Sequence, residues 1–278
     1  MSIGVFDSGI GGLSVHRALV SRLPEADFTY LADQAHAPYG GLSGERIVEL
    51  TRAGAERLFD RGASLVVLAC NTASAHALRR LQQTWLPDYR EAIGRPVNLL
   101  GLIVPTIEAA TGVAWAEEGA SQSADVVGVF STPGTTASRV YEIETAKRAP
   151  NLRLVSQPCH DLARMIEAGA TRESLRREIG EQVEALTLRI GRPPDRAILG
   201  CTHYELVADL FREALPPTTA LIHQPGPTAE ALARYLETHP EYEAGKSGER
   251  CFLTTGRPGE QNALAAAFWA APLRFEAA

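Results

Sequence analysis

The sequence is poor in lysine and has no long apolar run. Only two lysines, Lys147 and Lys246, occur among its 278 residues. No apolar stretch approaches the roughly 20 residues that a helix needs to cross a bilayer, so we expect no contact with a membrane. The first residues show no basic segment followed by an apolar one, so no secretory signal is predicted. Together with four cysteines whose spacing suggests no disulfide framework, this predicts a protein of the reducing cytoplasm.

Cysteine is scarce as well, and no basic run is present. The four cysteines have no CxxC spacing, so neither a disulfide framework nor a common zinc motif is indicated. The formal net charge of −6 argues against a general attraction to nucleic acid or to anionic membranes. The remaining composition, 45% hydrophobic and 22% charged, is typical of a globular chain with one large or two moderate domains.

Short apolar runs rich in Val, Ile and Leu alternate with amphipathic stretches along the chain. Strands are predicted over residues 3–6, 28–32, 64–69, 97–104, 126–130, 152–155, 197–199, 220–222 and 251–253. Helices are predicted over 45–61, with Ser43 as the N-cap, and over 172–190. The polar stretch 115–124 is expected to be an exposed loop. The alternation predicts an α/β architecture with mostly parallel sheets covered by helices.

Two cysteines, Cys70 and Cys201, occur in matching contexts. Each follows an apolar run and precedes polar residues and a predicted helix, in Ala-Cys-Asn-Thr-Ala (69–73) and Gly-Cys-Thr-His-Tyr (200–204). Ligands of parallel sheets bind outside the carboxyl ends of the strands, so both thiols indicate a site. A thiolate at a helix N-terminus is also stabilised by the helix dipole and by free N–H groups.

Other uses of these thiols stay open at this point. Free cysteines are often buried in cores, and Cys159 and Cys251, which lack the pattern, are expected to be structural. A zinc site could draw on Cys70, Cys201, His203 and Cys159, although no CxxC or HxxxH pair exists. A Cys–His nucleophile pair with His203 as the base would leave the second cysteine unexplained.

Small polar loops follow other predicted strands. Asp7 ends the first strand and is followed by Ser-Gly-Ile-Gly-Gly (8–12), which fits neither a dinucleotide fingerprint nor a P-loop. Tyr39 lies in Pro-Tyr-Gly-Gly (38–41), and hydroxyl donors follow another strand at 132–136. Together these loops offer acids, thiols and small hydrogen-bond donors, a set that suits a small zwitterionic acid.

On these residues the sequence resembles the glutamate racemases, within the aspartate/glutamate racemase superfamily. The matching stretches are 5–13, 30–33 with 38–40, 69–74 and 200–204, with weaker matches through 134–141 and 253–256. The resemblance covers nearly the whole chain. It implies two similar α/β domains with mostly parallel sheets, related by a pseudo-twofold axis, with the active site between them. We expect residues 1–97 and 208–278 to form the first domain and 98–207 the second.

The resemblance also implies a function: interconversion of L- and D-glutamate without cofactor or metal, to supply D-glutamate for peptidoglycan. Cys70 would take the proton of D-glutamate with help from Asp7, and Cys201 that of L-glutamate with help from His203. Glu167 would have an auxiliary role. The substrate would be held by Asp7, Ser8, Tyr39, Gly40, Asn71, Thr72, Thr202 and His203. The resemblance further implies a homodimer.

Two departures and two rival functions accompany the resemblance. The family usually has proline where this chain has Glu205, and the residues after Cys159 (160–166) lack the expected apolar, proline-containing run. Racemisation of aspartate or of another amino or imino acid is the first rival, and a glutamate-binding sensor without activity is the second. Neither lysine ends a predicted strand, which argues against a pyridoxal phosphate Schiff base.

Overall fold

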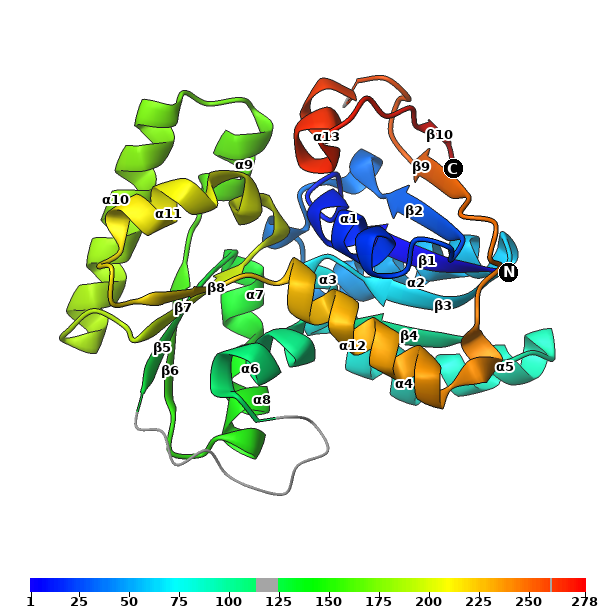
Figure 1. Ribbon diagram of the computed structural model, residues 1–278, viewed down its shortest axis with the longest axis horizontal. Coiled ribbons are helices and arrows are strands. Elements are labelled where there is room, and N and C mark those ends of the chain that lie inside the picture. The colour runs from blue at the N-terminus through cyan, green and yellow to red at the C-terminus, as the bar shows by residue number, and fades with distance from the viewer. Residues whose placement is uncertain (114–124, 261) are drawn as a thin grey trace. The chain divides into compact units, whose positions relative to one another are not determined.

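The computed structural model describes residues 1–113, 125–260 and 262–278 (Figure 1). The expected loop at 115–124 therefore lies outside the described residues. The chain divides into two compact units, Met1–Leu102 with Thr228–Ala278, and Ile103–Pro227. None of the described helices combines the length and apolar character needed to cross a membrane.

The first unit contains a six-stranded parallel sheet in the order β10-β9-β2-β1-β3-β4. Its strands are β1 (Ser2–Asp7), β2 (Phe28–Ala32), β3 (Ala63–Leu68), β4 (Asn98–Gly101), β9 (Arg250–Thr254) and β10 (Glu276–Ala277). Its helices are α1 (Leu13–Arg22), α2 (Gly44–Asp60), α3 (Asn71–Ala73), α4 (Arg79–Thr84), α5 (Leu86–Ile93) and α13 (Asn262–Trp269), with short turns η1 (Gln34–His36), η2 (Tyr39–Gly41), η3 (Ser74–Leu78) and η5 (Pro240–Tyr242). Helices α1 and α13 lie side by side (Figure 1).

The second unit contains a four-stranded parallel sheet in the order β6-β5-β7-β8. Its strands are β5 (Val126–Ser131), β6 (Arg153–Pro158), β7 (Arg196–Gly200) and β8 (Ala220–Ile222). Its helices are α6 (Ile103–Thr111), α7 (Pro133–Ser138), α8 (Val140–Arg148), α9 (Leu162–Glu167), α10 (Arg172–Ile190) and α11 (Ala208–Ala214), with the 3-10 turn η4 (Thr202–Val207). Figure 1 shows α10 and α11 on one face of this sheet and α6 and α8 on the other. Helix α12 (Pro225–Thr238) begins in this unit and ends in the first.

The parallel α/β architecture confirms the expected fold class. Strands β1 and β3 are almost wholly buried, as parallel strands covered on both faces should be. Helix α10 has the predicted bounds, and Ser43 caps α2 by accepting a hydrogen bond from the backbone N–H of Arg46.

Three details differ from the expectations. The predicted strand 97–104 is only partly a strand, because β4 ends at Gly101 and α6 begins at Ile103. An apolar run alone does not distinguish a strand from the first turn of a buried helix. The proline in this run is tolerated in the first turn of α6. Strand β10 was not predicted. The chain returns to the first unit at Thr228, not at 208, because β8 pairs with β7 in the second sheet.

Candidate active site

Three neighbouring strands of the first sheet end in side chains able to accept or carry a proton. Asp7 ends β1, Asp33 follows β2, and Cys70 follows β3 by two residues. The ladder continues past the strands, since the backbone N–H of Asp33 donates to the carbonyl of Asp7 at 2.9 Å. All three side chains are buried. The carboxyl edge of this sheet therefore brings together the acids and the thiol, as the sequence predicts for Asp7 and Cys70.

The Cys70 thiol lies where a thiolate is stabilised. Cys70 is the N-cap of α3, and its Sγ accepts a hydrogen bond from the backbone N–H of Ala73 at 3.5 Å. The hydroxyl of Ser8 lies 3.4 Å from the same sulfur. Because α3 continues into η3 and α4, the thiol lies at the start of a longer helical segment whose dipole favours negative charge.

The glycine loop after β1 is folded around Asp7. An Oδ2 of Asp7 accepts a hydrogen bond from the N–H of Gly9 at 3.0 Å, and the hydroxyl of Tyr30 donates to the carbonyl of Gly9 at 2.8 Å. A Cβ on Gly12 would lie 2.7 Å from the Cβ of Asp7, so only glycine permits this close approach. Burial raises the pKa of Tyr30 well above its usual value, and the charges of Asp7 and Cys70 raise it further.

Asp33 lies at the same edge of the sheet, and the sequence analysis gave it no role. It accepts hydrogen bonds from the hydroxyl of Tyr39 at 2.6 Å and from that of Thr255 at 2.7 Å, and the ring of His36 lies 3.0 Å away. Burial and the Asp33 carboxylate raise the pKa of Tyr39, so its phenol stays protonated. An acid directly after β2, like Asp7 at the end of β1, was the available signal.

The second thiol, that of Cys201, contacts a histidine, and the same histidine contacts a carboxylate. Cys201 follows β7, and its Sγ lies 3.7 Å from Nδ1 of His203. The Nε2 of His203 lies 2.9 Å from Oε1 of Glu167, at the end of α9. Burial lowers the pKa of His203, but its hydrogen bonds to Cys201 and Glu167 outweigh that effect and raise the pKa well above its ordinary value. The structure thus brings Glu167 to His203.

Two further residues of the second unit were missed or only weakly indicated. Tyr141 on α8 is buried; its burial raises the pKa of the phenol, and the charge of Cys201 raises it further. The side-chain amide of Gln224 donates to the Tyr141 hydroxyl at 2.9 Å. Nothing in the local sequence marks Gln224, because its partners lie far away along the chain.

The remaining predicted substrate-binding residues lie at the same two sheet edges. Ser8 lies in the loop after β1, and Gly40 lies in the turn η2. Asn71 and Thr72 begin α3, and Thr202 begins η4. Ser8, Asn71, Thr72 and Thr202 are buried, as side chains enclosed around a small ligand would be.

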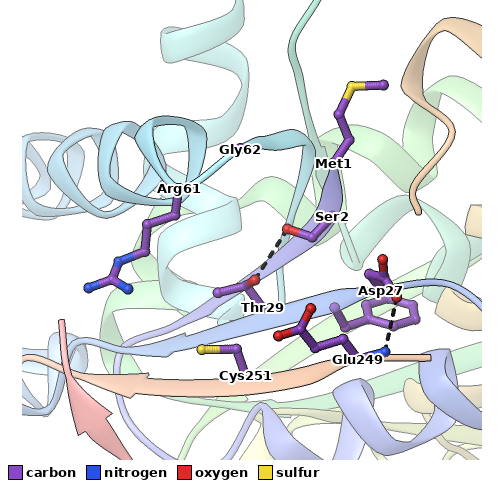
Figure 2. Close-up of a pocket in the computed structure, with 9 residues that line it drawn as sticks. Met1, Ser2, Asp27, Thr29, Arg61, Gly62, Glu249 and Cys251 are labelled. Carbon is purple, nitrogen blue, oxygen red and sulfur yellow. Dashed lines mark hydrogen bonds between the residues drawn. The ribbon is translucent and has the colours of Figure 1, made fainter. Parts of the chain in front are cut away.

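Cys159 and Cys251 have different surroundings. Cys159 is buried next to the end of β6, with its Sγ 3.8 Å from the carbonyl of Gln157, and burial raises its pKa. Cys251 lies near the amino end of β9, at the edge of the sheet opposite Cys70. There it lines a cavity of about 270 Å³ with Thr29 and Arg61 (Figure 2). Burial also raises the pKa of Cys251.

No cluster of three or more His, Cys, Asp or Glu side chains suited to a metal ion occurs within residues 1–113, 125–260 and 262–278. Each of the two lysines forms an ion pair with a glutamate on its own segment. Lys147 lies 2.5 Å from Glu144 on α8, and Lys246 lies 2.7 Å from Glu243.

The chain is similar over its whole length to known proteins. It shares 68% identity with the glutamate racemase of Caulobacter sp. (strain K31) over 283 residues, which cover 100% of both chains. It is similar to the crystal structure of a glutamate racemase isoform from Bacillus anthracis, with a TM-score of 0.83, 27% identity and coverage of 100% of this chain and 97% of that one. The glutamate racemase from Francisella tularensis in complex with D-glutamate gives a TM-score of 0.80 at 26% identity, with the same coverage. No family model matches the chain.

The two parallel sheets, each with a thiol directly beyond a strand, are thus the framework of an amino-acid racemase, an isomerase. Identity of 68% along the full chain shows the family: the chain belongs to the glutamate racemases. The family and the racemase activity on glutamate expected from the sequence are confirmed.

Proposed function

We propose that this chain interconverts L- and D-glutamate with two thiols, Cys70 and Cys201: one removes the α-proton and the other delivers a proton to the opposite face, without a cofactor or a metal. The observation that carries the proposal is the matched setting of the two thiols. Each follows a strand of a parallel sheet, and each has its own hydrogen-bonding partners and a nearby acid or base. Two monoprotic groups on opposite faces of one carbon can remove a proton and return another without turning the substrate.

On the first sheet, Cys70 removes the proton of D-glutamate as a thiolate. The N–H of Ala73 and the hydroxyl of Ser8 stabilise the sulfur anion before the transfer. The proton passes from the α-carbon to the Cys70 sulfur, and the Cys201 thiol delivers its own proton to the other face. Asp7, at the end of the neighbouring strand, assists Cys70 in exchanging its proton.

On the second sheet, His203 and Glu167 set the charge of Cys201. A protonated His203 donates from Nδ1 toward the Cys201 sulfur and from Nε2 toward Glu167. The imidazolium stabilises the Cys201 thiolate, which then removes the proton of L-glutamate, and Cys70 as the thiol completes the inversion. Each turnover leaves the protonation states of the two thiols exchanged, so proton exchange must reset them before the same direction can run again.

Glutamate is held by hydroxyl, amide and backbone groups at these two sheet edges. We assign this role to Asp7, Ser8, Tyr39, Gly40, Asn71, Thr72, Thr202 and His203. Because the Tyr39 hydroxyl donates to Asp33, its oxygen is left as an acceptor that suits the α-ammonium group. Preorganised donors around the carboxylate stabilise the carbanion, which has no cofactor to receive its charge. The D-glutamate complex of the Francisella tularensis enzyme supports this substrate.

The wider setting follows from the same proposal. The enzyme works in the cytoplasm as a homodimer and supplies D-glutamate for peptidoglycan. The ion pairs of Lys147 with Glu144 and of Lys246 with Glu243 support a reaction without a lysine Schiff base.

The proposal is tested by incubating the purified protein with L-glutamate in D₂O. We expect the optical rotation to decay to zero while the product D-glutamate gains deuterium at the α-carbon. Binding of glutamate without deuterium uptake would make the protein a sensor. A parallel panel of D- and L-aspartate and other amino acids distinguishes a racemase of different substrate preference.

A further inference from the structure

Glu205 joins the turn that carries Thr202 and His203 to the start of helix α12. It lies on η4, four residues beyond Cys201. Its Oε2 lies 2.7 Å from Nδ1 of His223, and its Oε1 accepts a hydrogen bond from the backbone N–H of Gln224 at 3.2 Å. The Glu205 side chain is only 12% exposed, whereas that of His223 is 50% exposed. A carboxylate this buried, with both oxygens engaged, holds two chain segments together.

Gln224 extends this connection back toward the thiol. Its buried amide donates to the hydroxyl of Tyr141 at 2.9 Å and to that of Thr106 at 3.2 Å. Tyr141 in turn is close enough to Cys201 for the charge of the thiolate to raise its pKa. Starting at Cys201, the backbone thus leads to Glu205, and hydrogen bonds lead from Glu205 through Gln224 to Tyr141.

The turn η4 needs such a connection. It is a 3-10 segment, whose hydrogen bonds are poorer than those of an α-helix, and it must hold His203 at 3.7 Å from the sulfur of Cys201. Glu167 holds the ring of His203 from outside the turn. Within this turn, Glu205 is hydrogen-bonded to His223 and Gln224, the two residues between β8 and α12.

The pairing of Glu205 with His223 favours the charged form of the imidazole. The hydrogen bond to Glu205 raises the pKa of His223, against the lowering effect of its partial burial. The family resemblance places a proline at position 205. A proline would stiffen the turn by fixing φ, whereas glutamate does so through hydrogen bonds to His223 and Gln224.

We propose that Glu205 is a positioning residue for proton transfer at Cys201: by tying η4 to His223 and Gln224, it aligns His203 with the Cys201 sulfur. The inference rests on the proposed roles of Cys201 and His203. It assigns Glu205 no contact with glutamate. Loss of Glu205 should therefore slow one proton transfer and not the other.

The test compares Glu205→Gln and His223→Gln with wild type. Glu205→Gln keeps the shape of the side chain but loses the charge, and we expect kcat/KM to fall about 10-fold, the effect of weakening hydrogen bonds to a charged group. The primary isotope effect on kcat/KM should grow with α-deuterated L-glutamate, whose proton leaves to Cys201, and stay unchanged with α-deuterated D-glutamate. His223→Gln should shift the same isotope effect by less, because the contact with Gln224 remains.

Glu213→Gln is the matched control. Glu213 forms an exposed ion pair with Arg176 between α11 and α10, in the same unit but outside η4 and without a bond to His223 or Gln224. This variant should leave both isotope effects and kcat/KM unchanged. A Glu205 with only a structural role would lower the melting temperature and the active fraction while changing neither isotope effect.

His203→Asn, measured in parallel, separates failure of the inference from failure of the proposed function. If His203→Asn enlarges the isotope effect with L-glutamate and Glu205→Gln does not, the positioning role of Glu205 is wrong and the roles of Cys201 and His203 stand. If His203→Asn itself leaves that isotope effect unchanged, the assignment of Cys201 and His203 fails, and the inference fails with it.

Discussion

The Nε2 atom of His203 lies 2.9 Å from Oε1 of Glu167, while Nδ1 of the same ring lies 3.7 Å from the sulfur of Cys201. A single imidazole therefore connects a carboxylate to a thiol, and both neighbours raise its pKa. Glu167 lies on α9 and Cys201 follows β7, so this alignment depends on the packing of two elements that are separated in sequence.

We predict that Glu167→Gln lowers the pKa of His203, because a neutral amide no longer stabilises the imidazolium. A group with a raised pKa is charged below that pKa and loses its charge as the pH rises through it. The pH range over which His203 is charged should therefore end at a lower pH in the variant. Titration of the His203 ring by NMR in both proteins measures this shift, and the alkaline limb of kcat/KM should move with it. An unchanged titration would show that Glu167 does not control the charge of His203.

Alanine at either proposed proton carrier should abolish racemisation. In Cys70→Ala and Cys201→Ala one face of the α-carbon has no group to give or take a proton, so we expect activity to fall by at least about 10³-fold, within the range for loss of a general acid–base group. Cys159→Ala and Cys251→Ala are the matched controls, because neither thiol is hydrogen-bonded to a histidine or caps a helix among the described residues. Both should keep most of the activity, with a loss of stability greatest at the buried Cys159. Full activity in Cys201→Ala would contradict the two-thiol mechanism.

Activity should persist after removal of metals and cofactors. We expect exhaustive dialysis against a chelator to leave the rate unchanged, because the proposed chemistry uses only side chains of the chain. The rate is followed by the optical rotation of L-glutamate before and after dialysis. A loss that added zinc or pyridoxal phosphate restores would falsify this part of the proposal.

Much of this site could be predicted from the sequence because the evidence for it is local. Cys70 and Cys201 each follow an apolar run, and Asp7 ends another. Asp33 and Gln224 were missed because their partners are remote: Asp33 and Thr255 are 222 positions apart, and Gln224 and Thr106 are 118 apart. The pairing of β8 with β7 is likewise non-local. The sequence therefore predicted the return of the chain to the first unit at residue 208, whereas it returns at Thr228. Strand β10, with two residues, is too short for any periodic pattern.

A buried histidine in the first unit should make the stability of the fold depend on pH. His16 is fully buried, its ring stacks on Trp269 at 5.1 Å, and neither of its nitrogens has a hydrogen-bond partner among the described residues. Burial, followed by the charge of Arg250, lowers the pKa of His16 to about 3. The unfolded chain binds this proton near the ordinary value of 6.5, so folding loses stability as the pH falls from 6.5 toward 3.

We predict that His16→Phe removes this sensitivity, because phenylalanine suits the aromatic surroundings and takes up no proton. At pH 5 the histidine costs wild type about 2 kcal/mol relative to neutral pH. The difference in unfolding free energy between wild type and variant, measured by urea denaturation at pH 7 and pH 5, should change by that amount in favour of the variant. His160→Gln, a change at an exposed histidine, is the control. A constant difference across this range would mean that His16 does not stay neutral in the folded protein.

Asp7 and His203 should serve different proton transfers, Asp7 at Cys70 and His203 at Cys201. Bulk rates do not separate them: the enantiomers of glutamate have equal free energies, so kcat/KM is the same in both directions for every variant. The step that limits the rate can still differ. In Asp7→Asn the transfer at Cys70 should slow, so α-deuterated D-glutamate should show a larger primary isotope effect on kcat/KM than in wild type.

In His203→Asn the enlarged effect should appear instead with α-deuterated L-glutamate, whose proton leaves to Cys201. The structure supports this division, because Asp7 is at the end of β1, next to the strand that leads to Cys70, whereas His203 contacts the Cys201 sulfur. Both substrates measured with both variants give a two-by-two comparison. If both variants enlarge the isotope effect with the same enantiomer, the assignment of Asp7 to Cys70 and of His203 to Cys201 is wrong. One thiol would then depend on both groups.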